Sequence, residues 1–262
     1  MTHSAARLDR SLLAAMLGVA VMLPAQHAVA QQSEWPSDDW HFKVTPYLWA
    51  TAIDGDVGIG RLPAVEIDAD FSDVLDELDF AFMGTAEARK GRWGVLFDGV
   101  YAKFSADADT PGPLFGKGTV DFVQQLYSLA GAYRLVEGHA PIDVLGGLRY
   151  VYVKPDVGLT AGLLPARSAS RTKDWIDGFA GLRIQYSITD RWSLLGYADI
   201  GGGGSDLTWQ ALGGVTYRIS KTFEAQLGYR YLSIDYDEGS GSDRFLYDIN
   251  MSGPYLSLGI YF

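Results

Sequence analysis

Three segments of the chain repeat an acidic residue followed six positions later by an arginine. The repeats are Asp143 with Arg149, Asp177 with Arg183 and Glu224 with Arg230. On an extended strand an even spacing puts both side chains on the same face, but six residues span about 20 Å, too far for a direct ion pair. Each charge must therefore find its partner on a neighbouring strand.

Antiparallel pairing supplies such partners. If the strands on either side of segment 158–170 pair around its middle, Asp143 opposes Arg183 and Arg149 opposes Asp177. Across two short turns, Arg134 opposes Asp143 and Arg218 opposes Glu224. We therefore predict one network of opposed charges on a shared face, made of Arg134, Asp143, Arg149, Asp177, Arg183, Arg218, Glu224 and Arg230.

The elements that position these charges are long strands. From residue 40 onward the chain alternates polar and apolar residues with a period of two and shows little helical periodicity. The expected strands are 40–53, 79–89, 93–106, 119–135, 141–157, 171–188, 191–201, 207–219, 223–237 and 245–262. Most exceed the five or six residues usual in soluble sheets and reach the roughly nine to eleven that a tilted strand needs to cross a bilayer.

Short and long connections alternate strictly between these strands. The short turns lie at 90–92, 136–140, 189–190 and 220–222. Transmembrane barrels show this asymmetry, with tight turns in the periplasm and longer loops outside. The fold prediction is therefore all-β: a transmembrane antiparallel up-and-down β-barrel of about ten strands, within a range of eight to twelve.

Aromatic residues gather near the short turns, in the alternation class expected to face outward. They are Trp93, Tyr133, Tyr186, Trp192, Tyr217, Phe223 and Phe262. Such rings suit the headgroup level of a membrane, since they combine an apolar body with a polar tip. The competing fold is a soluble sandwich or lipocalin-like barrel, in which the apolar class would face inward.

The last eight residues, Tyr255 to Phe262, alternate to the end and finish on an aromatic ring. This segment resembles the closing strand of bacterial outer-membrane β-barrel proteins of the small-barrel type. The resemblance implies an outer-membrane location, contact with lipid and lipopolysaccharide, and recognition of the strand ending in Phe262 by the barrel-assembly machinery. Thr45-Pro46-Tyr47-Leu48-Trp49 also resembles the opening strand of an uncharacterised group of such proteins, which implies no known activity.

Residues 1–30 read as a cleaved secretory signal peptide. Arg7 and Arg10 precede an apolar run of about twelve residues, too short for a membrane-spanning helix, and Ala28-Val29-Ala30 fits a cleavage site. We predict a periplasmic leader at 31–39 and the barrel at 40–262. Removing the peptide leaves 19 basic and 31 acidic residues, a net charge of −12.

Composition excludes several classes of protein. The chain has no cysteine, so disulfide scaffolds, thiol catalysis and thiolate metal sites are excluded. Its acidic balance argues against nucleic-acid binding, which needs basic patches. No cofactor is expected.

The segment 54–79 is rich in carboxylates, with Arg61 its single basic residue. Clustered carboxylates could bind calcium, but the segment lacks an EF-hand pattern, so a solvated face or a lipopolysaccharide-associated divalent layer is favoured and no metal site is predicted. Residues 71–78 could form a short helix, because apolar residues recur there at helical spacing. Gly201 to Gly204 are expected to form a flexible tip.

Three functions fit such a barrel. A small barrel leaves little space beyond its own side chains, so the charge network is expected to fill the lumen rather than to act as a selectivity filter or proton path. We therefore favour a non-enzymatic structural or interaction protein over a narrow diffusion channel for small solutes. An outer-membrane hydrolase ranks third, because the mature chain has only His41 and His139, both near the periplasmic rim.

Overall fold

A computed structural model describes residues 39–61, 64–109, 115–162 and 165–262. The predicted signal peptide and most of the predicted leader lie outside these ranges. None of the described helices is long and apolar enough to cross a membrane.

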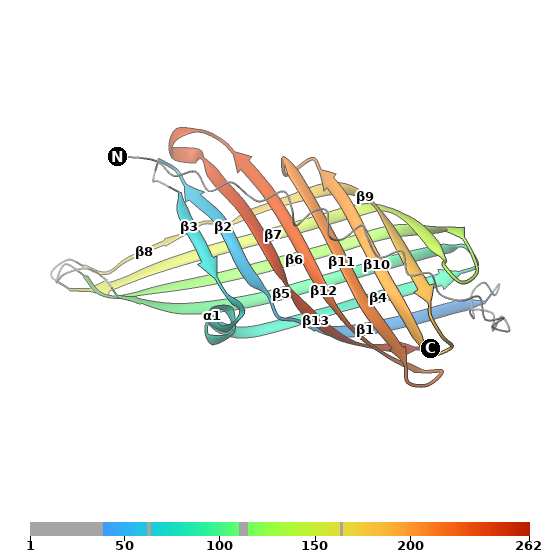
Figure 1. Ribbon diagram of the computed structural model, residues 1–262. Coiled ribbons are helices and arrows are strands. Elements are labelled where there is room, and N and C mark those ends of the chain that lie inside the picture. The colour runs from blue at the N-terminus through green and yellow to red at the C-terminus, as the bar shows by residue number, and fades with distance from the viewer. Residues whose placement is uncertain (1–38, 62–63, 110–114, 163–164) are drawn as a thin grey trace, which may run out of the picture. The chain divides into compact units, whose positions relative to one another are not determined.

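The strands form a closed antiparallel barrel (Figure 1). Ten strands make the wall: β1 (Trp40–Trp49), β4 (Leu78–Lys90), β5 (Trp93–Asp109), β6 (Phe115–Val136), β7 (Ile142–Ala161), β9 (Lys173–Ser187), β10 (Trp192–Gly202), β11 (Leu207–Arg218), β12 (Phe223–Glu238) and β13 (Phe245–Tyr261). They pair in this order, and β13 pairs with β1 to close the ring. The predicted ten-stranded barrel is confirmed.

Three further strands and two short helices lie outside this ring. They are β2 (Ala52–Ile59), β3 (Val65–Ala69), α1 (Phe71–Asp76), β8 (Arg167–Ser170) and the 3-10 helix η1 (Gly241–Asp243). Strand β8 pairs with β7, and β3 pairs with β2. The sequence does not predict β2, β3 or β8 as separate strands, because they lie in the long connections expected at 54–78 and 158–170 or continue the strand expected at 40–53.

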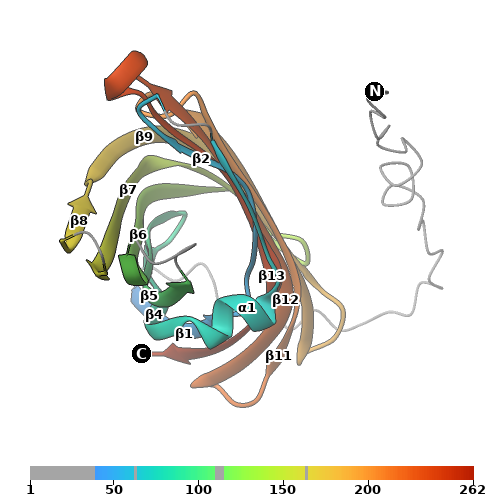
Figure 2. The same ribbon diagram turned by 90° about the vertical axis from the view of Figure 1, so that its left-hand side faces the viewer.

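Strands β1 and β2 follow one another along β13, and both pair with it. Lys43 pairs with Tyr261, Trp49 with Tyr255 and Ala52 with Ser252, so the register does not change between the two strands. On the other side, the ladder between β1 and β4 ends at Pro46 and Gly84. Helix α1 directly precedes β4, and Figure 2 shows it at the end of the barrel, next to this divergence.

The four short turns and the C-terminal strand end lie at the same end of the barrel. The turn between β4 and β5 contains Gly91 at φ 53°, a left-handed conformation that glycine adopts without strain. At this end the Phe262 amide donates to the Phe42 carbonyl at 2.9 Å. In membrane barrels short turns face the periplasm, so the opposite ends of the strands are extracellular.

The outer surface of the barrel is apolar in a broad band. Leu48, Trp93 and Leu227 expose 73%, 69% and 62% of their surface, whereas charged residues on the opposite faces are buried. Trp93 packs against Tyr133 near the periplasmic turns, with ring centroids 4.7 Å apart, and Trp209 stacks on Tyr231 toward the other edge at 4.8 Å. A surface that buries charge inside and exposes apolar rings outside suits lipid, not water.

In the extracellular part of the barrel the interior is apolar and the outer face is polar. Strands β6 and β7 have 22 and 20 residues, about twice what a bilayer crossing needs. Inside this part lies an apolar cluster, which we call the extracellular core; its most buried members are Val151, Val153, Leu232, Ile234, Phe245 and Ile249, each at most 2% exposed. The barrel therefore projects from the membrane as a water-exposed domain with its own hydrophobic core.

The glycine run after β10 is held in place rather than free. The amides of Gly204 and Ser205 donate to the buried Asp177 carboxylate at 3.0 and 2.7 Å. A side chain at Gly204 would lie 2.8 Å from the Ile176 carbonyl oxygen, so only glycine permits this approach. The expectation of a flexible tip is wrong, because the loop folds over β9.

Candidate functional site

The lumen near the periplasmic end holds a cluster of charges around one carboxylate, Asp143. Three guanidinium groups donate to it: Arg134 at 2.8 Å, Arg183 at 2.7 Å and Arg89 at 2.9 Å. Glu87 offsets part of the excess positive charge, because it accepts from Arg183 at 2.8 Å and from Arg89 at 3.1 Å. We call these five residues the lower charge layer.

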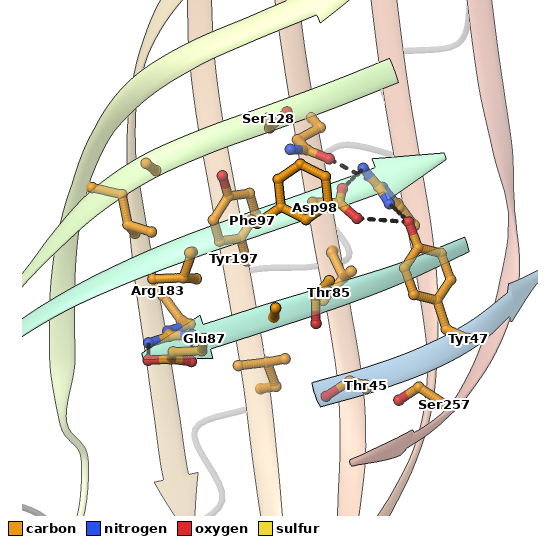
Figure 3. A pocket seen from close by; sticks show the side chains of 18 of the residues that line it. Thr45, Tyr47, Thr85, Glu87, Phe97, Asp98, Ser128, Arg183, Tyr197 and Ser257 are labelled. Atoms are coloured by element: carbon orange, nitrogen blue, oxygen red, sulfur yellow. Dashed lines mark hydrogen bonds and ion pairs between the residues drawn. The ribbon is translucent and has the colours of Figure 1, made fainter. Parts of the chain in front are cut away.

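A second group of charges, the upper charge layer, lies closer to the extracellular core. Arg149 donates to Asp199 at 2.8 Å, and its guanidinium lies 5.0 Å from the centre of the Phe179 ring. Arg230 donates to Asp98 at 2.8 Å and to the Tyr47 hydroxyl at 2.8 Å (Figure 3). Each guanidinium thus has a carboxylate partner, which buried charges require.

The residues that the sequence predicts to be opposite one another are opposite in the backbone register. Asp143 faces Arg183, Arg149 faces Asp177, Arg134 faces Asp143 and Arg218 faces Glu224. The side chains follow this register only at Asp143. Arg149 instead reaches Asp199, while Asp177 accepts backbone amides. Glu224 accepts from Lys43 at 2.5 Å and from the Tyr261 hydroxyl at 2.8 Å rather than from Arg218.

Sequence reasoning missed five lumen charges and one hydroxyl group. The charges are Lys43, Glu87, Arg89, Asp98 and Asp199, and the hydroxyl is that of Tyr47, which accepts from Arg230. All belong to the inward class of their strands. Strand parity could have identified the five charged ones. The acid-and-arginine spacing could not, because β1, β4, β5 and β10 do not repeat it.

A cavity of about 180 Å³ lies in the lumen between the two charge layers (Figure 3). Thr45, Thr85 and Ser257 lie on one side, contributed by β1, β4 and β13. Leu145, Leu195, Leu212, Ala130 and Phe179 also line it. We call this space the chamber.

The extracellular core closes the lumen beyond the chamber. Trp175 stacks on Tyr236 with ring centroids 4.1 Å apart, and Tyr247 meets the same indole edge-on at 5.9 Å. Ile234 and Val153 are completely buried in this packing. These residues come from β7, β9, β12 and β13, so side chains from several parts of the wall meet across the lumen.

The outer face of this projecting part carries rows of carboxylates across four strands. Asp235 of β12 faces Asp248 of β13, which faces Asp56 of β2, which faces Glu66 of β3. Like charges in direct opposition repel. Burial, followed by the charges of Asp248, Asp206 and Asp237, raises the pKa of Asp235 above its ordinary value.

Replacing Asp248 with Asn should lower the pKa of Asp235 toward its ordinary value. The change removes the like charge with the largest effect on the ionisation of Asp235. Because the folded-state pKa is raised, this group stabilises the fold increasingly as pH falls through that pKa. Carboxyl ¹³C NMR titration of the two proteins measures the shift, with the distant Asp79→Asn as control; an unchanged Asp235 midpoint in Asp248→Asn would contradict the argument.

The two histidines of the predicted mature chain lie at the periplasmic end. His41 is on β1 opposite Arg89, and His139 is exposed in the turn between β6 and β7. Among the described residues, no group of three or more histidine, aspartate or glutamate side chains is arranged to hold a metal ion.

Comparison with known proteins gives a fold. No protein-family model matches the chain, and no curated protein matches its sequence. Among solved structures, the outer membrane protease OmpT from Escherichia coli aligns with a TM-score of 0.52 at 8% identity, over 86% of this chain and 98% of that protein. The transport unit of the autotransporter AIDA-I from Escherichia coli aligns with a TM-score of 0.42 at 8% identity, over 95% and 97%. Neisserial surface protein A aligns with a TM-score of 0.35 at 12% identity, over 84% and 96%.

At these identities the likeness concerns the fold and carries no activity with it. The closed ring of tilted strands, its lipid-facing apolar band and its charged interior agree with the same architecture. The chain therefore has the fold of bacterial outer-membrane β-barrel proteins, and its lipid-facing apolar band agrees with a location in the outer membrane.

Proposed function

We propose that the protein is a closed, non-enzymatic barrel whose role is structural or interactive and is carried by its extracellular part. The observation that supports this most strongly is the extracellular core. Apolar side chains at most 2% exposed, among them Val151, Leu232 and Phe245, fill the lumen between the chamber and the outside. Water and ions avoid such a region, since apolar side chains offer them no hydrogen bonds.

The surface available for interaction is the acidic outer face of β12, β13, β2 and β3. Asp56, Glu66 and Asp248 are exposed and Asp235 is half-buried, while Asp54 also accepts from Asn250 at 3.1 Å. This face lies beyond the stacked pair Trp209 and Tyr231, which we place at the outer membrane surface. It is therefore presented to solvent and to the sugar region of lipopolysaccharide.

The arrangement of titratable groups favours a role without catalysis. His41 and His139 lie at the periplasmic end, far from the carboxylates of the outer face. Hydrolytic sites need a base that titrates near neutrality next to the nucleophile or water. Assays on peptide and phospholipid substrates, compared with Asp68 and Asp70 variants, test this part of the proposal; turnover that those substitutions abolish would contradict it.

Bilayer recording tests the closed lumen. We expect the full chain, reconstituted in planar bilayers, to show no regular conductance steps at neutral pH. Replacing Trp175, Tyr236 and Tyr247 together with alanine removes the ring stack and should produce measurable steps if the barrel still forms. Ion-selective steps from the unaltered protein would favour a narrow diffusion channel instead.

Assembly would use the C-terminal strand. Strand β13 ends beside β1, and Phe262 is 74% exposed on the outer surface. We infer that this end is the segment recognised by the barrel-assembly machinery. Replacing Phe262 with Ser should lower the amount of folded protein in the outer membrane, whereas refolding of the purified variant in detergent should remain close to that of the original chain.

A further inference from the structure

We propose that the chamber is a binding site for a small neutral molecule that carries a hydroxyl group on an apolar body about the size of one aromatic ring. The site lies within the lumen, between the two charge layers. This inference goes beyond the proposed closed barrel, which concerns the extracellular side alone.

The first observation is a buried hydroxyl without a partner. Ser257 is 6% exposed, and its Oγ makes no hydrogen bond within the described part of the chain. Its neighbours on both sides are already engaged. Tyr47, opposite on β1, donates to Asp98 at 2.7 Å, and Gln226, opposite on β12, donates to the Tyr255 hydroxyl. An unsatisfied buried hydroxyl costs free energy, which a bound donor or acceptor in the chamber would recover.

The second observation is the shape and polarity of the lining. Near Ser257, the chamber is lined by the hydroxyls of Thr45 and Thr85, which face each other across β1 and β4. The leucines, Ala130 and Phe179 supply apolar surface. A ligand therefore meets hydrogen-bonding groups and apolar groups in one space, as is usual for small-molecule sites.

The charges around the chamber exclude an ionic ligand. Arg183 is paired with Glu87 at 2.8 Å, Arg230 with Asp98 at 2.8 Å, and Lys43 with Glu224 at 2.5 Å. Each lining cation thus has its own carboxylate. An anion or cation in the chamber would have to displace one of these partners and leave a buried charge unpaired, which is strongly unfavourable.

The volume sets the size of the ligand. A cavity of about 180 Å³ is slightly larger than the roughly 150 Å³ engineered cavity that binds benzene. Phenol has the required single ring and hydroxyl group, so it is the appropriate probe.

Methyl NMR on the full chain in lipid nanodiscs tests the site with phenol as the probe. We expect saturable shifts of the methyl groups of Leu145, Leu195 and Leu212, which line the chamber. Leu48 and Leu256 face the lipid and report partition of phenol into the bilayer, so they serve as internal controls. Benzene, which lacks the hydroxyl, should bind about fivefold more weakly, and acetate should cause no shift.

Two substitutions separate the contribution of the Ser257 hydroxyl to phenol binding from that of the cavity volume. Ser257→Ala should weaken phenol binding about fivefold and bring it to the affinity of benzene, while Ala130→Leu should abolish saturation by filling the space. Ser233→Ala, on the outer face of β12, is the matched serine control. Shifts that never saturate, that are equal for Leu48 and Leu145, or that survive Ala130→Leu in a folded barrel would overturn the proposal and leave a chamber filled with water. Conductance is measured separately, so failure of the closed-barrel proposal would remain distinguishable.

Discussion

Replacing Asp143 with Asn should destabilise the barrel by about 3–5 kcal/mol, the range for a buried ion pair that loses one partner. Asp143 is 2% exposed and accepts hydrogen bonds from Arg89, Arg134 and Arg183. Without its charge, Arg134 loses its carboxylate partner, and Arg89 and Arg183 share the single carboxylate of Glu87. An uncompensated buried cation loses its hydration and gains no partner, so the cost falls on the folded state.

Urea unfolding in lipid vesicles, followed by tryptophan fluorescence, measures this effect. The matched control is Asp79→Asn, since Asp79 pairs with Lys103 at 2.8 Å but both side chains are about two-fifths exposed. Water solvates either partner there, so the unfolding midpoint should hardly move. Equal midpoints for the two variants would show that the lower charge layer contributes nothing specific to stability.

Replacing Phe245 with Ala should destabilise the protein by about 3–5 kcal/mol, the usual range for a phenylalanine removed from a packed core. Phe245 is 1% exposed and meets Tyr236 at a ring-centroid distance of 6.0 Å. The substitution leaves a cavity in the extracellular core, which neighbouring strands fixed by their ladders cannot collapse to fill.

Phe71 of α1 provides the comparison, because it lies in the same extracellular part but is 44% exposed. Phe71→Ala should therefore cost clearly less in the same unfolding measurement. If both substitutions lowered stability equally, the packing of the extracellular core would not be what stabilises this part. If protease cleaves the extracellular part of Phe245→Ala more readily than that of the original chain, the loss of stability lies in that part.

The barrel itself could be predicted from the alternation of polar and apolar residues. Each membrane-crossing strand has one face toward lipid and one toward the charged lumen, so residue polarity alternates with a period of two. Trp93, Trp192 and Phe223 lie outward near the short turns, where the sequence placed them. The extracellular core was not predicted, since its inward residues continue the same alternation that marks the membrane segments. Only the change of the outward residues from Tyr231 to Asp235 marks the membrane boundary on β12.

The charge network could be predicted as a backbone register but not as a set of bonds. An arginine side chain is long enough to bypass the residue directly opposite, so Arg149 reaches Asp199 two strands away. Asp177 is used instead to hold the loop after β10, a role that depends on backbone amides and that residue spacing does not reveal. The chamber is the space that the inward side chains leave unfilled, and the pattern of residue types along the chain does not predict where such space remains.

Strands β1 and β2 lie near the start of the chain and pair with β13 at its end, and this pairing constrains the order of folding. Lys43 and Glu224 are 181 residues apart, and their ion pair forms only when the first strand meets the last part of the wall. Loop-closure entropy opposes such distant contacts, whereas all other neighbouring wall strands are separated in the chain only by a turn, a loop or a short insertion. Closure is therefore the step with the greatest entropic cost, and the barrel gains its sealed interior only at the end of folding.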